Sequence, residues 1–214
     1  CEASRFLEII SHEEGTPPDD GVFQRGKARD SEGRVRVCLA DANELSVSII
    51  VMTELFKCPI TKKITLYRDL NTISLDVSFP WWGKTNRSMR LCLPFTHDRF
   101  NQTRYGVPFG SMRWPDMMIG VDDSVVLTAY KFNPDEVGEF ERRHVREVQK
   151  WLDVGYVDCG MAIGTTASNF FIDESYIEAI LLKTLTDCNE GHLPLLHPGA
   201  PHSRFTLAPH SRDW

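Results

Sequence analysis

The sequence predicts an all-β fold, a large antiparallel β-sandwich with few helices, and three observations predict it. Short apolar segments follow one another along most of the 214 residues. Several of these segments alternate apolar and polar residues at period two, which is the pattern of a strand with one buried face. Turn-forming residues separate the segments, and a chain of this length is long enough for one large sandwich domain.

The first 33 residues have a composition that resists burial. Gly15–Gly21 contains two prolines and two aspartates, and a charged stretch follows from Arg25 to Glu32. Such segments bury too little apolar surface to offset the entropy of ordering the chain. We therefore expect residues 1–33 to form a lead-in that is disordered in part, and residues 34–214 to form the sandwich domain.

From residue 35 onward the expected strands come in series. Ile73–Phe79 shows the pattern most clearly, because Ser74, Asp76 and Ser78 alternate with apolar residues. Leu45–Ile49 repeats the alternation. The full set is Val35–Leu39, Leu45–Met52, Ile64–Tyr67, Ile73–Phe79, Met89–Leu93, Val125–Phe132, Tyr156–Ile163 and Ile177–Leu182.

One segment, Pro134–Val148, has a helix-compatible composition. It is rich in Glu and Arg but lacks the apolar stripe at i, i+3 and i+4 of a packed helix. We therefore expect a charged connector there. A series of strands with almost no helices favours a sandwich or barrel over an α/β fold.

Composition and charge exclude several classes of protein. The formal net charge of −6 argues against a nucleic-acid partner, which requires clustered Lys and Arg. No apolar run reaches the roughly 18 residues of a membrane-spanning helix, so we expect no membrane partner. The six cysteines include no C-x-x-C pair, which removes the usual zinc and thioredoxin spacings. The sequence leaves the cellular compartment open.

No arrangement of residues typical of catalysis stands out. There is no Gly-x-Ser-x-Gly nucleophile elbow and no phosphate-binding glycine loop. Asp122 and Asp123 adjoin, so they point in different directions, and we interpret them as turn residues. The four histidines after residue 190 lie among prolines, and we interpret them as loop residues rather than metal ligands. The sequence thus predicts no catalytic residue, no metal site and no cofactor in this chain.

Aromatic residues offer better candidates for contact with a sugar. They are Trp81, Trp82, Tyr105, Trp114 and Trp151. Each is a rigid group on or beside an expected strand end, where a sugar ring can stack, although core packing is the commoner use of such residues. Arg113, beside Trp114, is a candidate hydrogen-bond donor to hydroxyl groups, and a structural ion pair is the alternative.

Five segments carry motifs whose order and spacing are hard to obtain by accident. They are Ile64–Val77, which contains Leu-Tyr; Tyr105–Arg113, with Tyr-Gly-Val-Pro-Phe-Gly and a final Arg; Gln149–Val154, with Trp-Leu-Asp-Val; Ile180–Lys183, with Ile-Leu-Leu-Lys; and Phe205–His210, with Phe-Thr-Leu-Ala-Pro-His. Taken in order, they resemble the C-terminal β region of glycoside hydrolase family 38, the retaining α-mannosidases, over roughly Val35 to Trp214.

The resemblance implies both a fold and a role. The family's region is a large supersandwich, related to the mutarotase-like fold, that packs on the catalytic domain and helps shape the sugar cleft. The family's zinc ion and catalytic residues belong to an N-terminal domain that these 214 residues do not contain. We therefore expect the isolated chain to be inactive and to have a catalytic domain and a mannoside as partners. We also expect an apolar surface patch where the catalytic domain docks.

The chain departs from the family pattern at positions that would contact substrate. Lys183 stands where the family has Arg, and Trp114 displaces the Pro that follows the Arg of the motif. An ammonium does not reproduce the bidentate geometry of a guanidinium. Arg113, Trp114 and Lys183 are the candidate substrate-binding residues, and a structural role is the alternative.

Two other functions remain open. A stand-alone carbohydrate-binding, lectin-like module would stack sugars on exposed Trp81, Trp82 or Trp114. An aldose-epimerase-like enzyme on the related fold would need a Glu base and a His acid, such as His97 or His144, facing one pocket.

Overall fold

The chain folds into two antiparallel sheets that pack face to face. The structure is a computed structural model, and it describes residues 7–13, 25–83, 87–94, 102–114, 145–155, 159–172, 176–184 and 198–211. Within these ranges every strand pairing is antiparallel, and the only helix is one short 3₁₀ turn. The predicted all-β fold and large antiparallel sandwich are confirmed. No described helix has the length and hydropathy of a membrane span.

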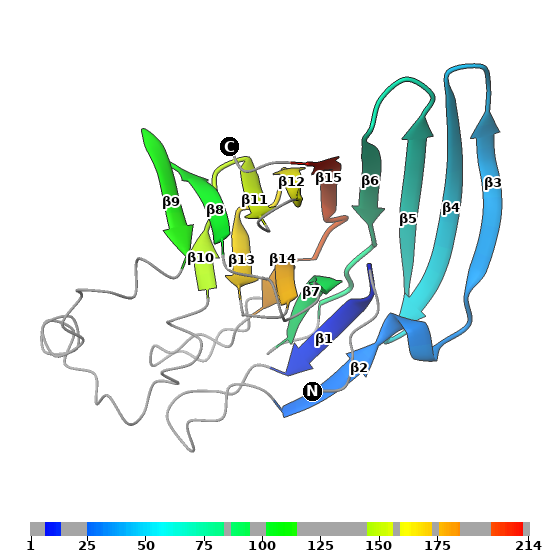
Figure 1. The fold of residues 1–214 in the computed structure, drawn as a ribbon. Coiled ribbons are helices and arrows are strands. Elements are labelled where there is room, and N and C mark those ends of the chain that lie inside the picture. Colours follow the sequence, from blue (N-terminus) through cyan, green and yellow to red (C-terminus); the bar gives the residue numbers. More distant parts are fainter. Residues whose placement is uncertain are drawn as a thin grey trace, which may run out of the picture.

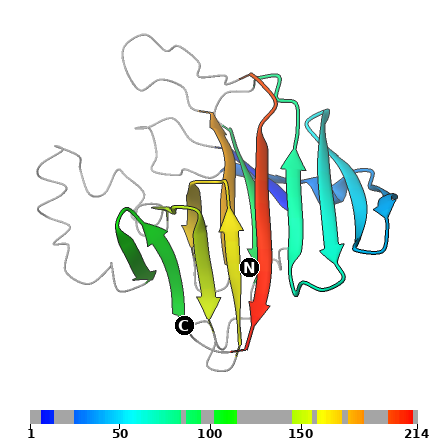
Figure 2. The same ribbon diagram turned by 90° about the horizontal axis from the view of Figure 1, so that it is seen from above.

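The larger sheet has nine strands and contains most of the predicted segments. Its order across the sheet is β3 (Arg36–Ala42), β4 (Ser46–Leu55), β5 (Cys58–Tyr67), β6 (Ile73–Ser78), β15 (His202–His210), β12 (Gly160–Thr165), β11 (Trp151–Gly155), β8 (Gln102–Val107) and β9 (Gly110–Trp114). The last strand of the chain, β15, therefore joins the β3–β6 meander to the remaining strands. Figure 2 looks onto this sheet, with β15 in red near its middle.

The smaller sheet has six strands and forms the second layer. Its order is β10 (Val145–Glu147), β13 (Asn169–Ile172), β14 (Tyr176–Thr184), β7 (Arg87–Pro94), β1 (Ile9–Glu13) and β2 (Arg25–Arg29), and the 3₁₀ turn η1 (Asp30–Glu32) leads from β2 toward β3. Figure 1 shows these strands below β8, β9, β11, β12 and β15 of the larger sheet, with β3 to β6 rising in a row at one side of the molecule.

The core lies between the two sheets and follows the period-two pattern. In β15, Phe205 and Leu207 are buried, while Thr206 between them is exposed. Register places Phe205 opposite Leu75 of β6, and both belong to one buried cluster with Met89 and Leu91 of β7. Each sheet thus supplies its apolar face to a shared core.

Part of the expected lead-in is strand. β1 lies between β7 and β2, and Ile9 is completely buried, so the sandwich begins before residue 34. Composition predicts too little order for this segment, because its charged groups have partners in the folded chain. Asp30 bonds Lys62 Nζ at 2.5 Å, Thr53 Oγ1 at 2.8 Å and the Ile9 amide at 2.9 Å.

Seven of the eight predicted strand segments overlap strands β3, β4, β5, β6, β7, β12 and β14. The eighth, Val125–Phe132, lies outside the described residues. Of the expected connector Pro134–Val148, the described part includes β10, so residues 145–147 are strand, and the rest also lies outside the described ranges.

Candidate functional site

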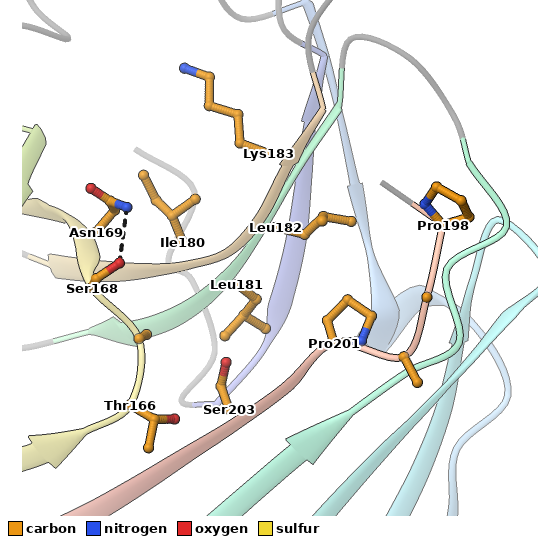
Figure 3. Close-up of a pocket in the computed structure, with 13 residues that line it drawn as sticks. Thr166, Ser168, Asn169, Ile180, Leu181, Leu182, Lys183, Pro198, Pro201 and Ser203 are labelled. Atoms are coloured by element: carbon orange, nitrogen blue, oxygen red, sulfur yellow. Dashed lines mark hydrogen bonds between the residues drawn. The ribbon is translucent and has the colours of Figure 1, made fainter. Parts of the chain in front are cut away.

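A pocket of about 670 Å³ brings together residues of both sheets (Figure 3). It is lined by Thr166–Asn169 at the start of β13, by Ile180–Lys183 of β14, and by Pro198–Pro201 and Ser203 at the start of β15. A bulge in β14 explains why four consecutive residues share one pocket. Ile180 pairs with Arg90 and Leu182 with Met89, so Leu181 is an inserted residue. Bulges of this kind redirect side chains and often lie beside functional sites.

The pocket offers hydrogen-bonding groups together with apolar wall. Asn169 Nδ2 donates to Ser168 Oγ at 3.2 Å, as Figure 3 shows, and Lys183 lies at the end of the β14 row. Among its described lining residues Lys183 is the only charged one, and no carboxylate accompanies it. The lining residues thus offer hydrogen-bond donors and acceptors, but the described ones provide no acid/base pair for hydrolysis.

The three predicted substrate-binding residues lie in different sheets. Arg113 and Trp114 belong to β9 at the edge of the nine-stranded sheet, opposite Arg104 and Thr103, whereas Lys183 belongs to the six-stranded sheet. Arg113 is exposed, and the side chain of Trp114 lies outside the described part of the structure. The substrate-binding role of all three stays a prediction.

The aromatic candidates divide into buried and exposed residues. Trp81 and Tyr105 belong to the buried core cluster, so neither can stack on a sugar. Trp82 is 70% exposed. Trp151 lies over Gly106, where a Cβ atom would come within 2.8 Å of the indole Nε1.

Two of the motifs recognised in the sequence meet in space. Asp153 of β11 and His210 of β15 form a pair with 2.7 Å between Oδ1 and Nε2. The His210 ring lies over Gly160, where a Cβ would come within 2.3 Å of it. The Asp153 side chain is almost completely buried, so the pair links β11 and β15 across β12, which lies between them.

The interpretation of the late histidines as loop residues is wrong for two of them. His202 and His210 are the first and last residues of β15, and His202 Nε2 lies 3.1 Å from Asp76 Oδ1. The other two, His192 and His197, lie outside the described ranges, as do His97 and His144. The described residues contain no group of three or more His, Cys, Asp and Glu placed to hold a metal ion.

A buried ionic cluster lies on β1, β7 and β14. Glu178 Oε2 is 3.2 Å from Arg90 Nη1 and 3.6 Å from His12 Nε2, and Arg90 Nε donates to Ser88 Oγ at 3.0 Å. Burial alone would raise the pKa of Glu178, but His12 and Arg90 outweigh it and hold that pKa below its ordinary value. All three side chains are shielded from solvent, so the cluster is structural rather than a site for substrate.

One end of the larger sheet leaves its inner apolar face uncovered. Along β5 the residues on this face go from completely buried Ile60 through partly buried Ile64 to Leu66, which is 52% exposed. On β3, Val37 and Leu39 are 61% and 66% exposed. The cross-strand pairs Leu39↔Ile49, Ile49↔Ile64 and Ile64↔Leu75 put these residues on the face that carries the core.

We call this surface the apolar overhang. It comprises Val37, Leu39, Val47, Ile49, Val51, Ile64 and Leu66. Contiguous exposed apolar residues of this kind mark interaction surfaces. The overhang matches the apolar patch expected from the sequence.

Comparison with known proteins gives a likeness in fold without a likeness in sequence. No protein-family model and no curated protein matches the chain. The structure of an α-mannosidase from Enterococcus faecalis V583 superposes with a TM-score of 0.72 at 9% identity, covering 97% of this chain and 26% of that one. A protein in the glycosyl hydrolase family 38 from Enterococcus faecalis gives 0.70 at 10% identity with the same coverage.

A galactose 1-epimerase from Lactobacillus acidophilus NCFM is a looser match, with a TM-score of 0.45 over 84% of this chain and 67% of that one. At that TM-score the likeness does not bear on the fold assignment. The two closer matches do, since they include nearly all of this chain. The chain thus shares the fold of a region that makes up about a quarter of each of these two glycoside hydrolase chains.

Proposed function

We propose that this chain is the accessory β-sandwich domain of an α-mannosidase-like glycoside hydrolase and packs on that enzyme's catalytic domain through the apolar overhang. The observation that carries the proposal is the uncovered inner face of β3, β4 and β5. A sheet face that continues the hydrophobic core requires a covering layer, and the six-stranded sheet covers only part of it.

The overhang is large enough to contribute substantially to docking. Burying a Val or Leu side chain contributes about 1.5–3 kcal/mol, and four overhang residues are more than two-fifths exposed, namely Val37, Leu39, Val47 and Leu66. Several kcal/mol of gross stabilisation are therefore available, against which the loss of rigid-body freedom must be set.

The coverage of the matched structures supports a catalytic-domain partner. Each of those chains is about four times as long as the part that this chain covers. The remaining part of such a chain is the natural occupant of the overhang, and it would also carry the catalytic residues and the zinc ion that the sequence resemblance implies.

We assign the pocket of about 670 Å³ beside the β14 bulge, which we call the bulge pocket, to the sugar cleft. Its hydroxyl, amide and ammonium groups suit a mannoside, and Lys183 would donate a single hydrogen bond rather than the bidentate pair of an arginine. Changing Lys183 to Met in the assembled enzyme should raise KM with little effect on kcat, because the contact would be the same in substrate and transition state.

The docking proposal is tested by combining this chain with the rest of a parent enzyme produced as a separate polypeptide. Leu66→Asp should weaken the association by at least about tenfold, or 1.4 kcal/mol, because docking would bury an unpaired charge. Leu70→Asp is the matched control, since Leu70 is also an exposed leucine but lies outside the overhang. Association is measured by calorimetry, with far-UV circular dichroism to verify folding.

The two variants separate docking from a general effect of added charge. Loss of association in Leu66→Asp but not in Leu70→Asp supports the proposal. Equal association of both variants with the catalytic part would overturn it.

Exposed Trp82 favours one alternative, a stand-alone carbohydrate-binding module. In that case Trp82→Ala would abolish glycan binding by the isolated chain, while Leu66→Asp would leave that binding unchanged.

A further inference from the structure

The strands of the apolar overhang carry a second pocket on their opposite face. It has a volume of about 500 Å³, within the range of small-molecule sites. Its lining residues come from five neighbouring strands and are all polar: Asp41, Ser46, Ser48, Lys63, Thr65, Tyr67, Ser74, Asp76 and Arg204. The pocket lies on the outer face of the nine-stranded sheet, away from the docking surface proposed above.

Cross-strand register arranges these residues in rows. Lys63, Asp76 and Arg204 are direct neighbours across β5, β6 and β15. A second row, from β3 to β6, consists of Asp41, Ser48, Thr65 and Ser74. Because each row is fixed by backbone pairing, the side chains of a row start from neighbouring positions on one face of the sheet.

The floor of the pocket is a pair of buried hydroxyl groups. Ser48 and Thr65 are 3% and 8% exposed, although the outer face of a two-layer sandwich is normally open to solvent. Their Oγ and Oγ1 atoms lie 2.8 Å apart. Whichever hydroxyl accepts in this pair keeps its own hydrogen, so the floor can still donate one hydrogen bond.

In the row of Lys63, Asp76 and Arg204, some polar atoms are available to bond a ligand. Arg204 Nε at 2.9 Å and His202 Nε2 at 3.1 Å both bond Oδ1 of Asp76. Burial would raise the pKa of Asp76, but these two partners outweigh it, so the carboxyl is ionised at neutral pH. No described residue donates to its Oδ2, and Lys63 Nζ and the Tyr67 hydroxyl have no hydrogen-bond partner among the described residues.

These groups define the chemistry of a ligand. Two cations, Lys63 and Arg204, balance two carboxylates, Asp41 and Asp76, so the lining has no net charge. A pocket without apolar walls does not favour an apolar ligand, and a balanced one does not favour an anion. Alternating donors and acceptors with one tyrosine ring suit a ligand that is neutral and rich in hydroxyl groups.

We propose that this outer-face pocket binds a neutral saccharide, with Asp76 Oδ2 and Lys63 Nζ bonding sugar hydroxyls above the Ser48–Thr65 floor. The site is separate from the bulge pocket and from the overhang, so it does not depend on docking. A saccharide bound there remains accessible when the overhang is covered, because the two surfaces lie on opposite faces of the same strands.

The test uses the 214-residue chain and α-linked mannobiose, followed by the backbone amide shifts of β4, β5 and β6 in NMR titrations. Saturable binding centred on these strands is expected, and Asp76→Asn and Lys63→Met should each weaken it at least about fivefold, or roughly 1 kcal/mol. Glu54→Gln is the matched control, since Glu54 is an exposed acid on β4 outside the pocket. Replacing mannobiose by sialic acid tests the requirement for a neutral ligand.

Weakening by both pocket variants with unchanged binding by Glu54→Gln establishes the site. The proposal is overturned if mannobiose does not bind at about 10 mM, which corresponds to a free energy of binding near −2.7 kcal/mol. It is also overturned if sialic acid binds more tightly than mannobiose, or if Trp82→Ala abolishes binding that Asp76→Asn leaves intact.

Discussion

The two ends of β5 have the same amphipathic pattern and opposite environments. Ile60, near the β4–β5 turn, is completely buried, whereas Leu66, on the same face of the same strand, is half exposed. Lys62 marks the limit of the cover, since its ammonium contacts Asp30 of η1 and the carbonyl of Leu7. The comparison shows that an apolar strand face predicts burial but does not identify the layer that covers it. The exposed end of β5 is therefore a candidate surface for binding a partner.

The largest expected difference between a buried and an exposed part of the molecule concerns ion pairs. Glu178→Gln removes the buried carboxylate that contacts Arg90 and His12 and should lower the free energy of unfolding by about 3–5 kcal/mol. Asp76→Asn removes one partner of the exposed pair with Arg204 and should lower stability by less than about 1 kcal/mol, because exposed pairs contribute little. Urea unfolding of both variants measures the difference, and equal losses would break the comparison.

A matched pair of leucines tests the comparison on one sheet face. Leu75→Ala opens a cavity in the covered core and should cost about 2–5 kcal/mol of stability. Leu66→Ala removes the same atoms from the overhang and should change stability by less than about 0.5 kcal/mol. Chemical denaturation of the isolated chain gives both values, and a loss at Leu66 as large as that at Leu75 would mean that the overhang is covered within this chain.

Two glycines on β12 allow a similar comparison of crowded and open positions on the outer face of the nine-stranded sheet. A Cβ at Gly160 would overlap the His210 ring, so Gly160→Ala should cost about 1–3 kcal/mol and disturb the Asp153–His210 pair. At Gly164 the nearest atom, Thr206 Cβ, is 3.7 Å away, so alanine fits there without a clash. Thermal unfolding should distinguish the two variants, and the account is contradicted if Gly164→Ala is the more damaging.

The smallest expected effect is a pH dependence of the exposed Asp76 pair. The pKa of the Asp76 carboxyl is lowered in the folded state, so ionised Asp76 favours folding above the unfolded pKa of about 3.9. This contribution disappears as the pH falls through the folded pKa. The difference in Tm between the parent and Asp76→Asn should therefore be present at pH 6 and shrink below pH 4, and a difference that grows in acid has the wrong sign.

Much of the fold follows from local pattern. The alternation in Ile73–Phe79 predicts β6 with the correct buried face, since Leu75 and Val77 are core residues. β1 and β2 escape prediction because both are short and β2 is rich in charge. Their stability comes from long-range contacts, such as that of Lys62 with Asp30, which follows β2 and accepts from the Ile9 amide. The β4–β5 turn also lacks a signal, since Phe56 and Lys57 take positive φ values of 54° and 62° without glycine or asparagine.

The sites depend on information that local pattern does not contain. Lys183 is identified by a motif, but its neighbours Ser203 and Pro201 come from the start of β15 and are brought together only by sheet order. The outer-face pocket is formed by five strands, and in the sequence each of its polar residues has the pattern of an ordinary solvent-facing residue. The buried state of Ser48 and Thr65 distinguishes that pocket, and only the folded chain reveals it.

The most direct test of the central claim is hydroxyl-radical footprinting of the overhang in the isolated chain and in the longer parent enzyme. The account predicts that modification of Leu39 and Leu66 falls several-fold in the parent, while Trp82, exposed outside the overhang, is modified equally in both. Equal modification of the two leucines in both forms would contradict the account, because the apolar overhang would then remain uncovered in the assembled enzyme.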